Sequence, residues 1–414
     1  MASENIVIVG GGLAGATAAK SLRAQGHGGP VILLAAEQHH PYLRPPLSKE
    51  YLLGKAEDDA LPVVPADWYS ENDVDLRLGT SVTGIDPAAR TAAVGDGLTL
   101  EYASLLLATG ARPRRLPLPG SDLDGVGTFR TVDDCRRLRA GLAGGGRNVV
   151  MIGSGWIGME LAAAASAYGN SVTLLGLEEV PLAAAVGPEL GGFFRSLHEA
   201  NGVRFRLPAS AAGIRGRSGQ ATGVETDSGE VLPADLVIIA VGVVPEVSLA
   251  EAAGVGLRNG ILTDASLRTS SPGIFAAGDV ANAVHPFTGE HHRSEHWSNA
   301  LNGGKVVARA MLGLDAALDT IPYFYTDQFD VSMEYSGFPT LAAGPPTLRG
   351  SLEEKEFLAF WQRDGRVVAG MNVNWPRAGK PQKIIKQLIS AQAAVDPRAL
   401  ADPSIPLDQL VPAA

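Results

Sequence analysis

The sequence of 414 residues contains one cysteine, Cys135. A redox-active disulfide needs two cysteines, so an internal dithiol relay is excluded, as are iron–sulfur clusters and other metal sites built on cysteine. Arginines follow Cys135 directly, and basic neighbours lower the pKa of a thiol. The commoner role of such a residue is that of an incidental helix position, and this is the interpretation we favour.

Long apolar runs are also missing. The longest, such as residues 236–244, fall far short of the ~20 residues that cross a bilayer. The chain enters an apolar strand at Ile6 without the basic segment or cleavage site of a signal peptide. We therefore expect a soluble, cytoplasmic protein.

Positive charge is in the minority, since 34 Lys and Arg stand against 44 Asp and Glu and give a net charge of -10. Such a balance disfavours nucleic acid or an anionic membrane as the partner. His291, His292 and His296 lie near one another in the sequence, but surface or packing roles are commoner for such residues than metal binding. No metal site is predicted.

Glycine, by contrast, is abundant, and one glycine cluster follows the predicted strand 6–9. The spacing G-x-G-x-x-G before a helical pattern at 16–25 is a dinucleotide-binding fingerprint, whose glycines allow a tight turn, close approach of a pyrophosphate and close helix packing. A second predicted strand, 31–34, leads to an acid that would accept the ribose hydroxyls. The candidate residues of this unit are Gly10, Gly12, Leu13, Ala14, Gly15 and Glu37.

A second fingerprint follows the strand at 149–152. The next strand, 172–175, is followed by Gly176 where a terminal acid is expected, and Glu178 is the alternative. No Arg or Lys lies nearby to accept a 2′-phosphate, so NADH is favoured over NADPH. The candidate residues here are Gly153, Gly155, Ile157, Gly158, Glu160 and Glu178.

Two dinucleotide units in one chain indicate a flavoprotein supplied with hydride by a nicotinamide, because one nucleotide usually stays bound while the other exchanges. Further motifs close later strands: Ala108-Thr109-Gly110, a glycine at Gly242, and Gly278-Asp279. Together they resemble the FAD-dependent pyridine nucleotide-disulfide oxidoreductase family, in which an NAD domain is inserted into a split FAD domain. By this resemblance Asp279 binds the ribityl chain of FAD.

The segment from Pro41 to Lys49 narrows the resemblance to the ferredoxin and redoxin reductases that serve monooxygenases and dioxygenases, with their apoptosis-inducing-factor-like relatives. The disulfide reductases of the wider family place cysteine in this region, and this chain has none. The resemblance covers essentially the whole chain.

The resemblance also implies roles for single residues. Lys49 lies beside the flavin N5 and pairs with Glu160, which can hold the nicotinamide carboxamide; these two are the catalytic candidates. Trp297 opens a helix that faces the flavin pyrimidine. Tyr325 stands near the flavin edge where the family usually has tryptophan, which leaves the efficiency of electron exit open. Arg44, Val82 and Arg130 match positions lining FAD. The remaining cofactor-binding candidates are Ala108, Thr109, Gly110, Gly242 and Gly278.

The fold expected is α/β, with two doubly wound Rossmann-like dinucleotide-binding domains and a small α+β C-terminal domain. The FAD domain takes residues 1–113 and 245–320, the NAD domain 114–244 and the C-terminal domain 321–414. In the last, strands are predicted at 331–335, 356–361 and 367–373, with a helix at 381–390. Lys380, Lys383 and Lys386 are predicted to share one helical face and Lys305 lies on the helix after Trp297; these are partner-docking candidates, with an ordinary solvated face as the alternative.

The leading hypothesis is an NADH-dependent ferredoxin reductase that passes single electrons to an iron–sulfur ferredoxin serving a cytochrome P450 or an oxygenase. Two alternatives stay open. One is a stand-alone flavin oxidoreductase acting on a small substrate or oxygen, and the other is an interaction protein that senses NADH.

Overall fold

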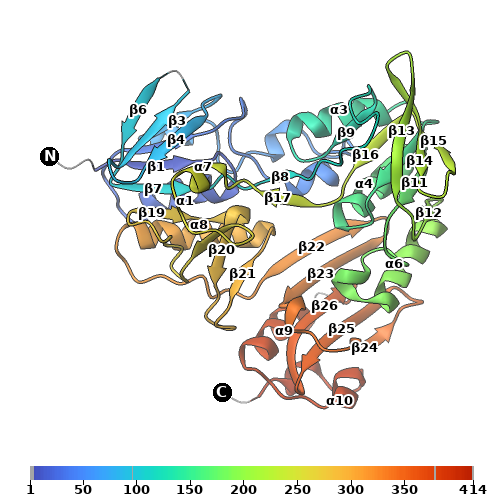
Figure 1. Ribbon diagram of the computed structural model, residues 1–414. Helices are drawn as coiled ribbons and strands as arrows, with labels where there is room; N and C mark the ends of the chain where they lie inside the picture. Colours follow the sequence, from blue (N-terminus) through green and yellow to red (C-terminus); the bar gives the residue numbers. More distant parts are fainter. Residues whose placement is uncertain (1–3, 96, 377–378, 413–414) are drawn as a thin grey trace. The chain divides into compact units, whose positions relative to one another are not determined.

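The structure, a computed structural model, describes residues 4–95, 97–376 and 379–412. The chain forms two compact units (Figure 1). The first unit comprises Met1–Arg44, Glu57–Arg112 and Val244–Pro322, and the second comprises Pro45–Ala56, Pro113–Val243 and Tyr323–Ala414. At two points the chain passes from one unit to the other within a short strand, in β8 (Ala111–Pro113) and in β17 (Val243–Pro245).

A five-stranded parallel sheet forms the centre of the first unit, in the order β19-β7-β1-β2-β3. Its strands are β1 (Ile6–Val9), β2 (Val31–Leu34), β3 (Val74–Arg77), β7 (Ser104–Leu107) and β19 (Ile274–Ala276). Strands β1 and β2 are apolar and buried along their whole length, as is typical of a parallel sheet covered on both faces.

Alternate side chains of these strands enter two different cores. Ile6 and Ile8 pack with helices α1 (Leu13–Ala24) and α8 (Trp297–Met311) on one face. Val7 and Val9 pack on the other face, against the antiparallel sheet β4-β5-β6. The remaining elements of this unit are α2 (Trp68–Glu71), β4 (Val82–Asp86), β5 (Thr91–Val94), β6 (Leu98–Glu101), α7 (Ser248–Ala252), β18 (Ile261–Thr263), β20 (Ala281–Val284) and β21 (His291–Arg293).

The second unit contains a sheet of the same kind, with the parallel order β12-β11-β10-β16-β9. Its elements are β9 (Val126–Thr128), α3 (Val132–Leu142), β10 (Asn148–Ile152), α4 (Trp156–Ala167), β11 (Ser171–Leu175), α5 (Ala183–Val186), α6 (Pro188–Ala200), β12 (Arg204–Arg206) and β16 (Leu236–Ile239). A small antiparallel sheet, β13 (Ala211–Arg217), β14 (Gln220–Thr226) and β15 (Val231–Pro233), covers part of its core.

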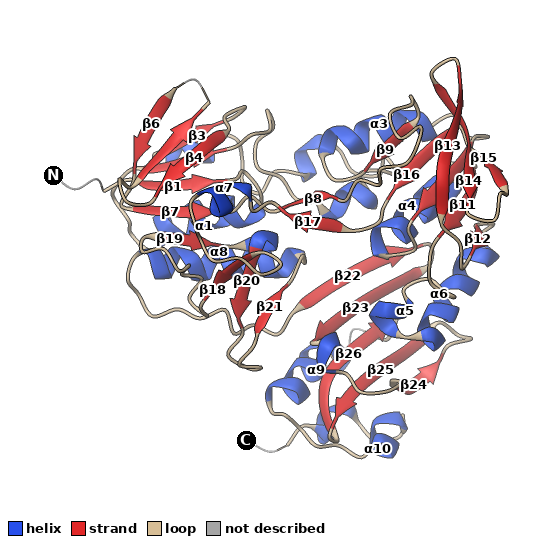
Figure 2. Ribbon diagram, viewed as in Figure 1, coloured by secondary structure: helices blue, strands red, loops and turns tan. Residues whose placement is uncertain are grey.

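The C-terminal part of the second unit is a five-stranded antiparallel sheet in the order β22-β23-β26-β25-β24 (Figure 2). Its strands are β22 (Tyr323–Gln328), β23 (Val331–Gly337), β24 (Thr347–Ser351), β25 (Glu356–Arg363) and β26 (Arg366–Val373). Helix α9 (Pro381–Ser390) packs its apolar face on β23 and β26, and the short helix α10 (Pro397–Ala401) follows.

The expected fold class is confirmed, and the predicted strands 6–9 and 31–34 and the predicted helix 381–390 agree to the residue. The first helix begins three residues earlier than predicted, at Leu13, because Gly12 already serves as its N-cap. The prediction that three lysines share a helical face was wrong for Lys380, which precedes α9 in a left-handed conformation with φ 48°. Among the described residues, no helix has the length and apolarity to span a membrane.

The adjacent glycines of α8 provide a test of the packing between α8 and α1. A Cβ atom on Gly304 would lie 2.7 Å from the Ala14 carbonyl oxygen, whereas one on Gly303 would meet nothing closer than 3.7 Å. We expect Gly304→Ala to cost about 1–3 kcal/mol through overpacking. Gly303→Ala should be neutral or stabilise by up to about 1 kcal/mol, since alanine is the better helix former. Thermal unfolding of both variants checks this, and a Tm for Gly304→Ala at or above the wild-type value contradicts it.

Candidate functional site

The first glycine cluster is shaped for a pyrophosphate. Gly10 has φ +123°, and a Cβ there would lie 2.2 Å from the Ala108 carbonyl oxygen. A Cβ on Gly15 would lie 2.1 Å from the Gly10 carbonyl oxygen, so only glycine lets α1 pack this closely. Gly12, in contrast, faces open space, and α1 has neither a side-chain cap nor an acid in its first turn. The free backbone N–H groups fit an anionic pyrophosphate.

The second cluster repeats this geometry. Gly153 has φ +117° and stands against the Ala240 carbonyl oxygen, which a Cβ would approach to 2.3 Å. Gly158 packs α4 on the Gly153 carbonyl oxygen, and Gly155 faces open space. Helix α4 also begins without a side-chain cap or an acidic first turn. Both clusters therefore fit a dinucleotide on the same observations.

Each fingerprint is followed by a carboxylate in an equivalent place. Glu37 stands three residues beyond the end of β2, and Glu178 stands three residues beyond the end of β11. The acid of the second unit is therefore not displaced relative to the first, contrary to the impression given by Gly176. A Cβ on Gly176 would lie 2.5 Å from the Ser154 hydroxyl, which explains why glycine occupies that position.

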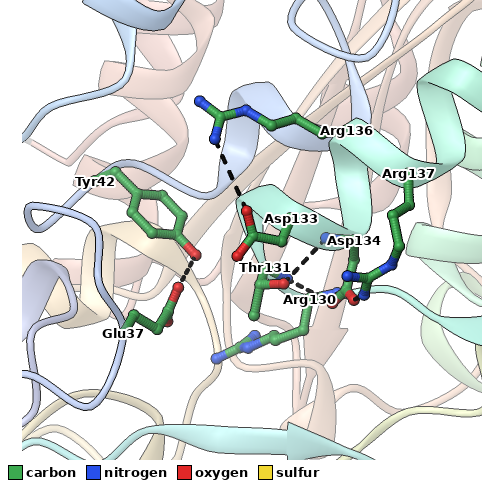
Figure 3. Close-up of polar contacts among 8 residues, drawn as sticks. All are labelled: Glu37, Tyr42, Arg130, Thr131, Asp133, Asp134, Arg136 and Arg137. Carbon is green, nitrogen blue, oxygen red and sulfur yellow. Dashed lines mark hydrogen bonds and ion pairs between the residues drawn. The ribbon is translucent and has the colours of Figure 1, made fainter. Parts of the chain in front are cut away.

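Local hydrogen bonds orient both acids. The Tyr42 hydroxyl donates to Glu37 at 2.6 Å, as Figure 3 shows, and the Arg44 guanidinium donates to its other oxygen at 2.9 Å. Glu178 accepts from the backbone N–H groups of Ala183 and Ala184 at 3.1 and 2.9 Å. Each carboxylate oxygen retains a second acceptor position, so these contacts orient the two acids and still leave each able to accept a further hydrogen bond.

Lys49 and Glu160 form a buried ion pair in the second unit. Lys49 follows a 3-10 turn over Pro45–Ser48, Glu160 lies on α4, and the Lys49 Nζ is 2.8 Å from Glu160 Oε2. Their side chains are 8% and 4% exposed. The predicted pairing is confirmed. Because a buried pair needs further hydrogen bonds to offset desolvation, its neighbours matter.

Three of these neighbours were missed in the sequence. The hydroxyls of Ser48 and Thr326 both donate to the Glu160 carboxylate, the latter at 2.6 Å to Oε1, and Gln328 donates to Thr326 at 3.1 Å. Polar residues at the alternating, inward positions 326 and 328 of β22 were the available signal, because a buried strand face is otherwise apolar. Nothing in the sequence identified their partner.

Tyr325 lies beside Lys49, whose Nζ is 5.3 Å from the centre of the tyrosine ring. Burial, assisted by the negative charges of Glu50, Asp327 and Glu160, raises the pKa of Tyr325 to about 12. The phenol therefore stays protonated at physiological pH, and the ring provides an aromatic contact for the lysine.

A capping box places Arg130 at the start of α3. The Thr131 hydroxyl accepts from the Asp134 backbone N–H at 3.1 Å, and the Asp134 carboxylate accepts from the backbone N–H groups of Thr131 and Arg130 at 2.9 and 3.0 Å (Figure 3). Cys135, one residue further on, is buried and donates to the Leu47 carbonyl oxygen. Burial outweighs the nearby arginines and raises its thiol pKa to about 12. Cys135 lies within α3, in line with its interpretation as an incidental helix residue.

The other candidate residues lie on the expected elements. In the first unit, Gly278 meets α1, since a Cβ there would lie 3.0 Å from the Ala14 Cβ, and Asp279 is buried. Thr109 donates to the Glu246 carbonyl oxygen, and Trp297 is the first residue of α8. Leu13, Val82 and Gly110 of this unit, and Ile157 and Gly242 of the second, lie at element ends or turns as expected.

The histidines show no metal centre: no group of three or more His, Cys, Asp or Glu in 4–95, 97–376 and 379–412 is arranged to hold a metal ion. Burial lowers the pKa of His292, and burial with the nearby His292 lowers that of His296 to about 4. Among the docking candidates, Lys305 and Lys383 are exposed. Lys386 is half-buried, with its Nζ 4.4 Å from the centre of the Tyr323 ring, and burial lowers its pKa.

Comparison with known proteins returns two family models. Residues 4–304 match the pyridine nucleotide-disulphide oxidoreductase model, and residues 323–411 match the reductase C-terminal model. The chain is 40% identical over 98% of its length, and 99% of the relative, to the ferredoxin–NAD(+) reductase component of an anthranilate 1,2-dioxygenase system from Burkholderia cepacia.

Solved structures are similar over nearly the whole chain. One is a covalent putidaredoxin reductase–putidaredoxin complex, with a TM-score of 0.94, 34% identity and 99% of each chain covered. Another is the ferredoxin reductase for the CYP199A2 system of Rhodopseudomonas palustris, with a TM-score of 0.94, 33% identity and coverage of 99% of this chain and all of the other.

The open space at Gly155 allows a test of whether the second glycine cluster binds the coenzyme. Gly155→Ala should fold normally, because its Cβ meets no protein atom within 4 Å, but should weaken NAD+ binding by about tenfold or more by occupying the pyrophosphate space. Gly192→Ala on α6, whose Cβ also meets nothing, is the matched control and should bind NAD+ normally. Calorimetric titration with NAD+ measures both. Wild-type affinity in Gly155→Ala would show that the second glycine cluster does not bind the coenzyme.

Proposed function

The chain belongs to the pyridine nucleotide-disulphide oxidoreductase family, as expected from its sequence, and from this membership we infer that it is an NADH-dependent ferredoxin reductase. Members of this family bind FAD and NAD(H). When bound, FAD accepts hydride from NADH and releases electrons singly, which links a two-electron donor to an iron–sulfur acceptor. The ferredoxin would in turn supply a cytochrome P450 or an oxygenase, as the names of the relatives suggest for their own systems.

One observation carries the proposal: Lys49 and Glu160 form a buried ion pair, and Lys49 lies in the segment where, by the family resemblance, disulfide reductases carry cysteine. The ammonium group of Lys49 stabilises negative charge that develops beside it, and Glu160 neutralises the lysine when that charge is absent. Neither residue needs to transfer a proton. With a single cysteine in the chain, the electrons cannot leave through an internal dithiol.

The remaining assignments are part of the same proposal. The glycines, the acid and the strand-end residues of the first unit are assigned to FAD. They are Gly10, Gly12, Leu13, Ala14, Gly15, Glu37, Arg44, Val82, Ala108, Thr109, Gly110, Gly278, Asp279 and Trp297. Lys49, Arg130 and Tyr325 are assigned as contacts of the flavin. For NADH, the set is Gly153, Gly155, Ile157, Gly158, Glu160, Glu178 and Gly242. Glu178, held by two backbone N–H groups, accepts the ribose hydroxyls and favours NADH over NADPH.

The domain division also remains a proposal: an FAD domain at 1–113 and 245–320, an NAD domain at 114–244 and a C-terminal domain at 321–414. The matched family models support it in part, since the first ends at residue 304 and the second begins at residue 323. A cytoplasmic location is likewise proposed, as the sequence led us to expect.

An anaerobic experiment tests the proposed function. The flavin absorbance of the purified protein should be bleached rapidly by NADH, more slowly by NADPH at the same concentration, and restored by a [2Fe–2S] ferredoxin from a panel. Bleaching without recovery by any ferredoxin favours the two other hypotheses. Recovery with a small organic substrate or oxygen then indicates a stand-alone flavin enzyme, and NADH-induced dimerisation with slow turnover indicates a sensor.

The ion pair gives a second prediction. Lys49→Met and Glu160→Gln should each leave one buried charge unpaired, with a loss of about 3–5 kcal/mol in the free energy of unfolding. The double variant should regain much of that stability. Lys49→Met should also slow flavin reduction by NADH roughly 100-fold, as is typical when a charge-stabilising group is removed. Denaturant unfolding and stopped-flow reduction measure the two effects. Equal reduction rates in wild type and Lys49→Met would remove the lysine from the reaction.

A further inference from the structure

A chain of buried polar side chains extends from Glu160 into the second unit. Thr326 Oγ1 lies 2.6 Å from Glu160 Oε1, Gln328 Nε2 lies 3.1 Å from Thr326 Oγ1, and His198 Nε2 lies 2.9 Å from Gln328 Oε1. All four side chains are buried. They come from α4, from β22 and from α6, so the chain links three separate elements.

The carboxylate fixes the direction of every bond in this chain. An ionised Glu160 has no proton to give, so the single hydroxyl proton of Thr326 points to it. Thr326 can then only accept from Gln328, which must present its NH₂ group to the threonine and its carbonyl oxygen to His198. His198 must therefore carry its proton on Nε2. Each donor points toward the negative charge, and such aligned bonds reinforce one another.

His198 is suited to end the chain. Burial lowers its pKa to about 4, so the ring is neutral at physiological pH and adds no second charge. Its Nδ1 atom is buried and has no hydrogen-bond partner among the residues described. The rings of Phe205 and Phe329 pack at 6.2 and 4.9 Å from its centre and hold its orientation.

The bonds to Glu160 use most of the capacity of its carboxylate. A carboxylate offers about four acceptor positions. Ser48 and Lys49 occupy the two on Oε2, and Thr326 occupies one on Oε1. Among the described contacts, one position on Oε1 remains. This is the position that an amide N–H of the coenzyme would require.

We propose that Thr326, Gln328 and His198 are positioning residues for the coenzyme: they orient the Glu160 carboxylate so that one acceptor position of Oε1 stays directed to the nicotinamide carboxamide. This inference rests on the proposed function, in which Glu160 binds that group. The neighbouring residue on the same strand, Tyr325, contacts Lys49. Strand β22 thus holds both members of the ion pair through consecutive residues.

Three variants separate positioning from stability. Thr326→Val removes the hydroxyl with little change in shape and should weaken NAD+ binding and slow flavin reduction by about tenfold or more, the loss expected for a hydrogen bond to a charged group. Thr326→Ser retains the hydroxyl and should restore both. Ser336→Ala in β23 deletes another buried hydrogen bond, a 2.8 Å donation to Gln382, and should lower stability without changing either value.

A double-mutant cycle with Glu160→Gln decides the mechanism. If Thr326 acts through the carboxylate, Thr326→Val should add little once Glu160 is replaced, in NAD+ affinity measured by calorimetry as well as in reduction rate. Additive effects, or a Thr326→Val variant that binds NAD+ like wild type, overturn the proposal. NAD+ affinity is measured on the oxidised protein, so the cycle remains decisive even if no ferredoxin accepts electrons. A failure of every ferredoxin to accept electrons would contradict only the proposed function.

Discussion

The buried ion pair between Lys49 and Glu160 sets a requirement that the surrounding residues of the second unit meet. Two charges removed from water are stabilised only when their remaining donors and acceptors are matched by other groups. The Ser48 and Thr326 hydroxyls match Glu160, and the Tyr325 ring contacts the lysine. The turn at 45–48, helix α4 and strand β22 must therefore keep their relative places for the pair to form.

The turn and the strand end pack closely in both nucleotide units, but different residues make this possible in each. In the first unit, Gly11 of the turn stands against Ala35 at the strand end, where a Cβ on the glycine would come within 2.5 Å of the alanine Cβ. In the second, the larger residue is in the turn, Ser154, and the glycine is at the strand end, Gly176. In both units the turn and the strand end approach closely, so the side chains at these two positions can have only a small combined volume. This limit, and not the loss of an acid, explains Gly176.

The sequence predicted what depends on neighbouring residues and missed what depends on distant ones. The fingerprints at Gly10 and Gly153 are contiguous segments whose glycine spacing has a direct steric meaning, so their strands were located to within one residue. The Lys49–Glu160 pair joins residues far apart in the chain and was found only through family resemblance. Thr326 lies 166 positions from Glu160, and His198 lies 130 positions from Gln328, so no local pattern could reveal those contacts. Lys380 was misplaced because it precedes the first residue of α9 in a left-handed conformation, so the helical spacing of the lysines does not extend to it.

In the proposed reaction, electrons taken from NADH leave through a ferredoxin. Ferredoxin-mediated reduction of cytochrome c, with NADH as the only donor and ferredoxin as the only variable, tests it most directly. We expect a rate that rises with ferredoxin concentration and falls to the background when ferredoxin is omitted. A rate independent of every ferredoxin supplied, with NADH still consumed, would contradict it.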